Sequence, residues 1–511
     1  MKNCTSAPPD VSRSLPELFA RAGVGAIGGG DIPSATITSL TDDSRSVRSG
    51  ACFVAIRGVG RDGHDFVPSA VTSGAAAIVV ERDAPTPRGV AFVRVADTRV
   101  ALAKLAAAFY GLGDDAGSPL CMVGVTGTNG KTTVAWLLRS ILQAAGRSTA
   151  MLGTVEYDLL GERRPAPLTT PGSIELCRHL ATAREAGATH AVLEVSSHAL
   201  DQHRCDGLTF AAGVFTNLTG DHLDYHRTMD AYLAAKRRLF EMLDPSAVAV
   251  VNVDDPRGEL LVGSTAASVV TYGIESPTAD VRAGIRGMDR RGTHFMLHGR
   301  TMELPLHTPL IGHHNVLNAL AAAATAEAIG VSAAAIRGGL ESVSGVPGRL
   351  QRAEPPGWAY SVFVDYAHTD DALANVLRTL RPLTTGTLRC VFGCGGDRDR
   401  TKRPRMAATV GELADVAYVT SDNPRSEDPH AIIDEILHGF SPSDECRIVV
   451  DVDRKRAIES ALAEAEAGDT VLIAGKGHET YQLVGDRVLP FDDVEVARKW
   501  MDAAALTEAV A

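Results

Sequence analysis

The 511-residue sequence predicts an α/β protein of three domains. Three observations support this fold class. At about 150 residues per domain, the length corresponds to roughly three domains. Short apolar stretches alternate with helical patterns, which is typical of mainly parallel sheets. Segments containing glycine and proline, at residues 113–119 and 345–348, interrupt this alternation. We therefore expect domains at residues 1–117, 118–344 and 345–511.

The first domain is expected to be a small α/β domain. Short strands are predicted at residues 51–56, 76–80 and 91–95. Two polar loops, at residues 42–45 and 57–65, lie beside these strands in the sequence. Loops of this kind often carry binding residues, so they are candidates for contact with a ligand.

The second domain shows a stronger alternation of strands and helices. An apolar strand is predicted at residues 120–125, and Val134, Leu137, Leu138 and Ile141 then recur at helical spacing. Further strands are predicted at residues 191–195, 213–217 and 247–253, and a helix at 319–328. This pattern predicts a mainly parallel sheet.

The third domain is expected to be Rossmann-like. Strands are predicted at residues 362–365, 389–392, 416–420 and 471–474, and each is followed by a polar loop. In open α/β sheets, ligands bind beyond the carboxyl ends of the strands. The repeated polar loops therefore predict a second binding site.

Composition excludes several classes of protein. A formal net charge of −12 argues against a nucleic-acid binder. No run of about 18 apolar residues is present, so we expect no membrane span. No signal peptide is visible, and the eight cysteines are scattered without a CxxC pair, which fits a reducing cytoplasm and makes a zinc site improbable.

The sharpest motif is Thr-Gly-Thr-Asn-Gly-Lys-Thr-Thr at residues 126–133, between a predicted strand and an amphipathic helix. Glycines let backbone N–H groups approach phosphates, and a helix N-terminus favours negative charge. Lys131 can reach the terminal phosphates and the Thr132 hydroxyl can hold Mg²⁺. Val125 replaces the leading glycine of the strict pattern. We expect a phosphate-loop (P-loop) ATPase domain whose nucleotide site includes Gly127, Thr128, Asn129, Gly130, Lys131, Thr132 and Thr133.

Two later residues bear on the reaction. Glu194 ends a predicted strand, and a carboxylate there suits Mg²⁺, which prefers oxygen ligands. His222 lies in a Gly-Asp-His-Leu-Asp-Tyr-His segment. Alone, Glu194 is better explained as an ordinary buried acid and His222 as a loop histidine. Beside a phosphate loop, both are better explained as parts of a site. Lys236 lies in a segment whose composition predicts a basic, solvated helix face.

At these residues the sequence resembles the Mur ligase family, whose phosphate loop also lacks the leading glycine. Further segments match the family in the same order along nearly the whole chain: Glu-Val-Ser-Ser-His at 194–198, Thr-Asn-Leu-Thr-Gly-Asp-His-Leu-Asp-Tyr-His at 216–226, Tyr-Leu-Ala-Ala-Lys at 232–236, residues 312–318 with His314, Asn315 and Asn318, Pro-Gly-Arg at 347–349, and Asp-Tyr-Ala-His-Thr at 365–369.

The resemblance implies an ATP-dependent ligase. A substrate carboxylate attacks the γ-phosphate of ATP, and an amine then displaces phosphate from the acyl phosphate. Lys131, Lys236, Glu194 and His222 are the implied catalytic residues. Asn315, Arg349 and Asp365 are implied to contact ATP. In the family, the lysine that matches Lys236 is carbamylated by CO₂, so the implied Mg²⁺ ligands are Thr132, Glu194, His222 and Lys236 as a carbamate.

The resemblance also places a UDP-N-acetylmuramoyl dipeptide. The UDP-sugar is expected at Asp42, Ser44, Val59, Gly60 and Arg61. The peptide arm is expected at Thr169, Thr170, Ser196, Gln202 and Arg204. Leu168 departs from the asparagine found in some relatives. We expect the protein to be a monomer.

The loops of the third domain bear on which amine is added. The Asp-Asn-Pro-Arg form at residues 422–425 is typical of family members that add meso-diaminopimelate. A carboxylate at the far end of this substrate favours a bidentate arginine. The expected contacts are Arg398, Asp422, Asn423, Pro424, Arg425, Gly475 and Glu479. The residues alone equally allow an ordinary turn with a solvated arginine.

Several alternatives stay open. The chain could add lysine, add a dipeptide, or be a folylpolyglutamate synthetase. It could also be a P-loop ATPase that moves a partner, or an inactive nucleotide-binding scaffold.

Overall fold

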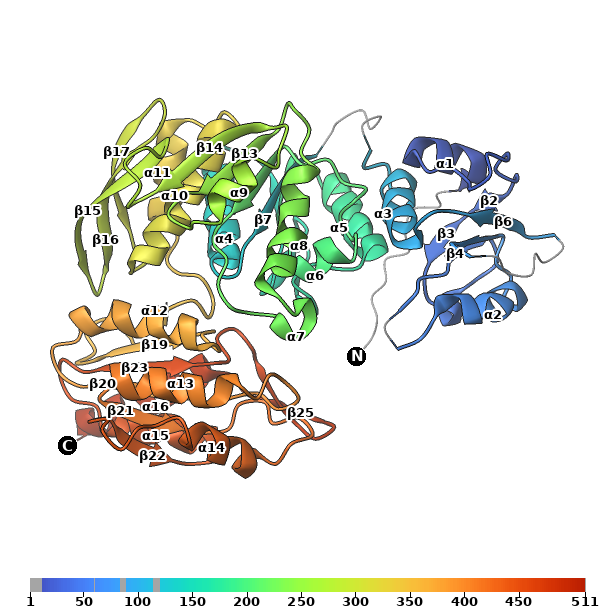
Figure 1. Ribbon diagram of the computed structural model, residues 1–511. Helices are drawn as coiled ribbons and strands as arrows, with labels where there is room; N and C mark the ends of the chain where they lie inside the picture. The colour runs from blue at the N-terminus through green and yellow to red at the C-terminus, as the bar shows by residue number, and fades with distance from the viewer. Residues whose placement is uncertain (1–11, 59, 83–88, 114–119, 511) are drawn as a thin grey trace.

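A computed structural model describes residues 12–58, 60–82, 89–113 and 120–510. Figure 1 shows three α/β units along the chain. The predicted boundaries at 117/118 and 344/345 stay a prediction, and most of the segment expected to link the first two domains, residues 114–119, lies outside the described residues. Within the described part of the chain, no helix is long and apolar enough to cross a membrane.

The first unit is built on a four-stranded parallel sheet, which confirms the three strands predicted there. Its order is β3 (Ser39–Thr41), β4 (Ala51–Val54), β5 (Ala77–Val80) and β6 (Ala91–Arg94). Helices α1 (Leu15–Ala22) and α3 (Thr98–Phe109) cover one face of the sheet, and α2 (Val67–Thr72) covers the other (Figure 1). Strands β1 (Arg13–Ser14) and β2 (Thr36–Ile37) form a separate short pair.

The central unit is built on an eleven-stranded sheet. Its parallel core runs in the order β8 (Thr149–Leu152), β11 (His190–Glu194), β7 (Cys121–Thr126), β12 (Ala212–Phe215), β13 (Val248–Asn252), β14 (Ser268–Gly273) and β15 (Val281–Asp289). The predicted strands at 120–125, 191–195, 213–217 and 247–253 are confirmed within this core. The sheet topology places β7 between β11 and β12, so the loops that follow these three strands emerge side by side.

Antiparallel strands extend the central sheet at both ends. Strands β9 (Glu156–Asp158) and β10 (Arg163–Pro165) lie at one end, and β16 (Gly292–His298) and β17 (Glu303–Thr308) at the other. The sequence analysis predicted none of these four, because they lack the continuous apolar runs of the parallel core.

Helices cover both faces of the central sheet. They are α4 (Lys131–Ala144), α5 (Ser173–Glu185), α6 (Ser197–Asp201), α7 (Leu223–His226), α8 (Met229–Glu241), α9 (Gly258–Val262), α10 (His313–Ala328) and α11 (Ala333–Ser342). The predicted helix at 319–328 is the C-terminal part of α10. Helix α4 packs against both α10 and α11, which fixes the helix that follows the phosphate loop.

The C-terminal unit has a six-stranded sheet, parallel except for one edge strand. Its order is β18 (Gln351–Arg352), β19 (Ser361–Asp365), β23 (Thr470–Ala474), β20 (Leu388–Phe392), β21 (Val416–Val419) and β22 (Arg447–Val450). Helices α12 (Asp370–Leu380), α13 (Lys402–Leu413) and α14 (Pro429–Leu437) cover one face, and α15 (Arg454–Ala463) and α16 (Asp493–Val510) the other. A hairpin of β24 (Tyr481–Val484) and β25 (Arg487–Pro490) follows β23. The four predicted strands are confirmed.

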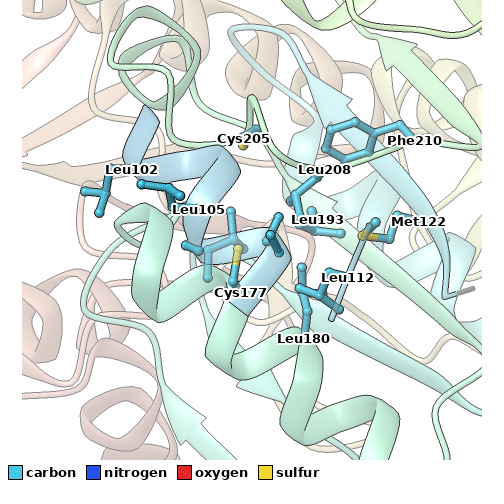
Figure 2. Close-up of a cluster of buried hydrophobic side chains, with 14 of the residues drawn as sticks. Leu102, Leu105, Leu112, Met122, Cys177, Leu180, Leu193, Cys205, Leu208 and Phe210 are labelled. Atoms are coloured by element: carbon cyan, nitrogen blue, oxygen red, sulfur yellow. The ribbon is translucent and has the colours of Figure 1, made fainter. Parts of the chain in front are cut away.

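The first two units share one apolar core. Figure 2 shows Leu102 and Leu105 of α3 packed toward Cys177 and Leu180 of α5. All four side chains are at most 5% exposed. Two separate clusters fill the C-terminal unit on the two faces of its sheet. The first two units are therefore packed as one body.

Candidate active site

The loop at residues 127–130 follows β7 and begins α4, as predicted. Gly127 and Gly130 have φ values of 148° and 89°. A Cβ on Gly127 would lie 1.8 Å from the Thr216 hydroxyl oxygen, and one on Gly130 would lie 2.4 Å from Asn318 Oδ1. Both positions therefore require glycine, because the loop is pressed against the end of β12 and against α10. Thr128 N and Asn129 N donate to the Asn217 carbonyl and side-chain oxygens, which further orders the loop.

Two lysines meet at the same carbonyl of this loop. Lys131 Nζ lies 2.9 Å from the Gly127 carbonyl oxygen and 2.7 Å from that of Thr128. Lys236 Nζ reaches the Gly127 oxygen at 2.7 Å and lies 4.3 Å from the centre of the Tyr232 ring. Burial lowers the pKa of Lys131 and lowers the pKa of Lys236 well below its usual range, and Lys131 lowers the pKa of Lys236 further.

The solvated position that composition predicted for Lys236 is wrong, because the side chain is only 1% exposed. Tyr232, Leu239 and Phe240 of the same helix are buried beside it, whereas Arg237 is half-exposed and pairs with Glu241. The sequence places charge on both faces of α8, so composition could not identify the face that turns inward. Lys236 is the residue that turns inward, because its side chain packs against the phosphate loop.

Glu194 ends β11 beside the loop and is 1% exposed. Thr132 Oγ1 donates to Glu194 Oε2 at 3.0 Å. Thr154 donates to the same carboxylate through its backbone N–H at 2.8 Å and through its hydroxyl at 2.8 Å. The hydroxyl and carboxylate oxygens of Thr132 and Glu194 are hard ligands suited to Mg²⁺.

His222 lies among aromatic side chains near the loop. It adopts φ 55°, and its ring centroid lies 4.9 Å from that of His198 and 6.2 Å from that of Tyr232. Tyr232 in turn contacts Thr128, with 3.2 Å between their hydroxyl oxygens. Burial lowers the pKa of His222 to about 4 against the opposing effect of Asp221. The ring is therefore neutral at physiological pH.

The C-terminal unit contributes side chains to this site. Arg349 Nη2 donates to Thr132 Oγ1 at 3.3 Å, and its guanidinium lies 4.6 Å from the centre of the Tyr366 ring. Asp365 accepts from Leu350 N at 2.6 Å and from Ala367 N at 2.8 Å. Asp365 thus fixes the chain beside Arg349.

Asn315 reaches the phosphate loop through a neighbour. Its Nδ2 donates to the Ile311 carbonyl at 2.9 Å, and its Oδ1 accepts from Asn318 Nδ2 at 3.1 Å. Asn318 is the residue whose Oδ1 faces Gly130. A second contact of the loop comes from the C-terminal unit, where Asn129 Nδ2 lies 3.4 Å from Asp371 Oδ2 at the start of α12.

The residues expected to hold the peptide arm form one network beside Glu194. Thr170 Oγ1 donates to the Glu194 carbonyl at 2.8 Å and accepts from Ser196 N at 3.0 Å. Arg204 donates to the Thr170 carbonyl at 2.7 Å and to Gln202 Oε1 at 2.8 Å. The Thr169 hydroxyl oxygen lies 3.1 Å from that of Thr154. Leu168 is 50% exposed at the edge of this network.

The residues expected to hold the UDP-sugar lie on loops after β3 and β4. Asp42 is exposed, Ser44 starts a short 3-10 turn, and Gly60 and Arg61 are exposed. Val59 lies outside the described residues. A polar cavity of about 510 Å³ lies beside these loops, and the sequence analysis did not predict it. It is lined by Arg57, Asp62, His64, Glu81, Arg82, Ala96 and Asp97.

Three loops of the C-terminal unit come together beyond β20, β21 and β23. Gly396 N donates to the Asn423 carbonyl at 2.9 Å, and Arg425 Nη1 donates to the Gly396 carbonyl at 2.7 Å. Asn423 Nδ2 donates to Glu479 Oε2 at 2.8 Å. Arg425 is half-buried with φ 53°, whereas Arg398 is exposed and donates to the Asp397 carbonyl.

Two tight contacts fix the shape of these loops. A Cβ on Gly475 would lie 2.7 Å from Asp422 Oδ2, and one on Gly396 would lie 1.9 Å from the Pro424 carbonyl oxygen. Lys476 is fully buried, and its Nζ lies 3.1 Å from Asn423 Oδ1, 3.4 Å from Glu479 Oε2 and 3.6 Å from Asp422 Oδ1. The sequence expectation omitted Lys476, although it lies between Gly475 and Glu479.

Family models match three parts of this chain. Residues 36–110 match the Mur ligase family catalytic domain, residues 125–326 the Mur ligase middle domain, and residues 348–477 the Mur ligase glutamate ligase domain. The chain belongs to the Mur ligase family.

Individual Mur ligases resemble the chain over most of its length. The UDP-N-acetylmuramoyl-L-alanyl-D-glutamate–2,6-diaminopimelate ligase of Geobacter metallireducens is 46% identical over 479 residues, which cover 90% of this chain and 93% of the relative. The Gloeobacter violaceus ligase of the same name is 44% identical over 490 residues, covering 95% and 97%. A solved structure of a ligase of this name is 34% identical, with a TM-score of 0.68 and coverage of 92% of this chain and 95% of that one.

Membership of the Mur ligase family explains why motifs far apart in this sequence meet. Segment 126–133 and Glu194 lie at the ends of neighbouring strands of one sheet, and Lys236 reaches the same loop from helix α8. Thr154 and Lys476 were not predicted as site residues, because a lone threonine or lysine outside the assigned motif positions does not mark a site. Only their contacts with Glu194 and Glu479 single them out.

Proposed function

We propose that this Mur ligase adds meso-diaminopimelate to UDP-N-acetylmuramoyl-L-alanyl-D-glutamate at the expense of ATP, in the cytoplasmic synthesis of peptidoglycan precursors. The supporting observation is one continuous cluster that joins the phosphate loop, Glu194, the buried Lys236 and Arg349 of the C-terminal unit. Because one chain assembles this cluster, we take the monomer as the active unit. The names of the relatives that match almost the whole chain support the choice of substrates.

The first step is phosphoryl transfer from ATP to the substrate carboxylate. The carboxylate oxygen forms a bond to the γ-phosphorus, the bond to the β–γ bridging oxygen breaks, and an acyl phosphate and ADP result. Such transfers depend on positioning and on neutralising charge. Lys131 supplies a cation at the loop, and Arg349 supplies a second one from the opposite unit, 3.3 Å from Thr132.

The residues around Thr132 fit Mg²⁺, which would neutralise charge on the phosphates when bound. Thr132 and Glu194 would provide oxygen ligands. Lys236 fits carbamylation, because burial lowers the pKa of its amine well below the usual range and so favours the neutral form, which is the form that reacts with CO₂. The resulting carbamate is an anion like a carboxylate and would be a further oxygen ligand. His222 stays a predicted ligand, although an imidazole nitrogen suits Mg²⁺ less well.

The second step needs the amine of the incoming amino acid at the acyl carbon. The amine nitrogen forms a bond to that carbon, phosphate leaves, and the amine loses a proton. The loops around Asp422, Arg425 and Glu479 would hold the far end of diaminopimelate, which carries both an ammonium and a carboxylate. Arg425 would pair with the carboxylate, and Glu479 would accept from the ammonium. Lysine has no carboxylate there, so Arg425 would face its ammonium.

The test is mass spectrometry of the product. The protein is incubated with ATP, Mg²⁺, the UDP-muramoyl dipeptide and an equimolar mixture of lysine and meso-diaminopimelate. We expect a single tripeptide product with the mass increment of diaminopimelate, one ADP formed for each product, and no product from Lys131→Ala. A lysine product would identify a lysine-adding ligase. ADP release without any amine product would identify an ATPase of another kind.

A further inference from the structure

A buried ion pair lies beneath the loops of the C-terminal unit. Arg454, at the start of α15, and Asp493, at the start of α16, are both 0% exposed at their side chains. Arg454 Nε donates to Asp493 Oδ1 at 2.9 Å, and Nη2 donates to Asp493 Oδ2 at 2.7 Å. This two-pronged geometry is the strong form of an arginine–carboxylate pair.

The same guanidinium also binds the end of a strand. Arg454 Nη2 donates to the Ala474 carbonyl at 2.9 Å. Ala474 is the last residue of β23, and the next residue, Gly475, has φ 115° and donates from its N–H to the Asp365 carbonyl at 3.0 Å. Arg454 therefore ties two helices to the point at which the Gly475–Glu479 loop leaves the sheet.

Charge links the pair to the loop residues as well. Burial opposes the charged form of Arg454, but Asp493, Asp422 and Glu479 together raise its pKa. Lys476 lies within 3.6 Å of both Asp422 and Glu479. Lys476 thus contacts the carboxylates of Asp422 and Glu479 directly, and the charge of Arg454 acts on the same two groups.

We propose that the Arg454–Asp493 pair is a positioning unit for the amine site. Held by Asp493, Arg454 fixes the carbonyl of Ala474 and thereby the direction in which Gly475, Lys476 and Glu479 continue. This inference rests on the proposed function, because it takes the Gly475–Glu479 loop as part of the amine site. It concerns the pair as a support for that site, and neither residue is expected to touch the substrate.

The test compares two buried pairs of the same domain. The Arg454→Lys variant keeps the positive charge but loses the planar guanidinium that binds both the Asp493 carboxylate and the Ala474 carbonyl. The matched control is Arg389→Lys. Arg389 of β20 pairs with Asp469 at 2.5 Å, and the two side chains are 9% and 5% exposed. Asp469 directly precedes β23, so this second pair lies at the opposite end of the same strand, away from the loops.

We expect Arg454→Lys to raise the KM for the amine about tenfold or more, because a small displacement of a binding group has large kinetic effects. The KM for ATP should rise much less than the KM for the amine, because the phosphate loop belongs to another sheet and Arg454 reaches Asp365 only through Ala474 and Gly475. Arg389→Lys should lower the melting temperature without a selective change in the amine KM. Asp493→Asn, which keeps the shape of the side chain, should show the same selective rise in the amine KM. It serves as the test variant if Arg454→Lys does not fold.

An unchanged amine KM in a folded Arg454→Lys or Asp493→Asn variant would overturn the inference, and so would an equal rise in Arg389→Lys. All measurements use whichever amine the wild-type protein ligates. If that amine is not diaminopimelate, the proposed substrate is wrong, but the selective KM effect still decides the role of the pair.

Discussion

At the scale of single residues, the burial of Lys236 indicates its role. An unpaired ammonium in this position is costly, and its hydrogen bond to the Gly127 carbonyl does not neutralise the charge. Lys131 at the same carbonyl raises the cost further. A buried lysine with a strongly lowered pKa beside a phosphate loop is therefore better explained by a chemical role than by a contribution to stability.

We predict that Lys236→Ala lowers the rate of ligation roughly 100-fold or more, the usual order for removing one preorganised charged group from an active site. Added formate or acetate should restore part of the activity, because a small carboxylate can occupy the position of the carbamate. The measurement is kcat with and without the added carboxylate.

Arg237→Ala is the control for this prediction. Arg237 is the next residue of the same helix, half-exposed and paired with Glu241. The activity of Arg237→Ala should stay near that of the wild type, because exposed ion pairs on a helix contribute little to stability. Full activity of Lys236→Ala would show that the lysine has no catalytic role.

Arg425 is the residue on which the choice of amine depends. We predict that Arg425→Ala raises the KM for diaminopimelate by roughly 10- to 150-fold, since a charged hydrogen bond is worth about 1.5–3 kcal/mol. The KM for ATP should not change, and lysine should be affected much less, because it has no carboxylate to lose. Alanine keeps a Cβ at φ 53°, so backbone strain is the same in both proteins.

The comparison requires the apparent KM values of both amines and of ATP. Arg381→Ala is the control, because Arg381 is 40% exposed at its side chain and pairs with Asp415, which directly precedes β21 and so lies at the opposite end of that strand from Arg425. If the diaminopimelate KM is unchanged in Arg425→Ala, then Arg425 is a turn residue.

His190 makes stability depend on pH. Burial, followed by the nearby Arg147, lowers the pKa of His190 to about 4, and Arg147 Nη1 lies 3.1 Å from its Nε2. Between pH 6.5 and pH 4 the unfolded chain binds a proton that the folded chain does not. This contribution therefore favours folding above pH 6.5 and is lost as the pH falls through that window.

We predict that wild type loses about 1 kcal/mol more stability than His190→Gln between pH 7 and pH 5, after allowing for partial solvent screening. Denaturant unfolding at both pH values measures the difference. His430→Gln, at an exposed position, should follow the wild type. Parallel behaviour of wild type and His190→Gln would contradict the prediction.

At the scale of elements, the packing of α11 on α4 holds the helix that begins at the phosphate loop. Gly339 makes this contact possible. A Cβ there would lie 2.3 Å from Ile141 Cα and 2.6 Å from Ile141 N, which are backbone atoms that cannot move aside alone. The neighbouring Gly338 is exposed, and the nearest atom to its added Cβ is Ala144 Cβ at 4.0 Å.

We predict that Gly339→Ala destabilises the protein by about 1–3 kcal/mol and weakens ATP binding, because overpacking displaces α4. Gly338→Ala should instead be neutral or stabilising by up to about 1 kcal/mol, because alanine is the better helix former. Thermal unfolding and nucleotide titration of the two variants test the pair. Equal stability of both variants would show that α11 can shift without affecting α4.

At the scale of the whole molecule, α3 of the first unit and α5 of the second belong to one core (Figure 2). A defect in this core should reach both units. We predict that Leu105→Ala costs about 2–5 kcal/mol and speeds hydrogen exchange in α3 and α5 together, because the cavity lies between them. Leu377→Ala, equally buried in the core of the C-terminal unit, should speed exchange only in that unit. If Leu105→Ala speeds hydrogen exchange in α3 but not in α5, the first unit opens independently of the second.

The sequence by itself determined the parts that depend on local chemistry. Apolar runs of strand length predicted the parallel strands, because strands buried on both faces must be apolar throughout. Glycines before a lysine at the start of an amphipathic helix predicted the phosphate loop, because its backbone angles and close contacts exclude side chains. The order of the motifs along the chain then identified the family resemblance.

Only the tertiary structure decided which side chains meet. Glu194 lies beside Thr132 because the sheet order places β11 next to β7, an arrangement that does not follow the order of the chain. Lys236 turned out to be buried because α8 presents one of its charged residues to the phosphate loop, and helix composition does not identify that residue. Charge alone cannot distinguish a solvated lysine from a buried one, since the difference lies in what the fold packs around it.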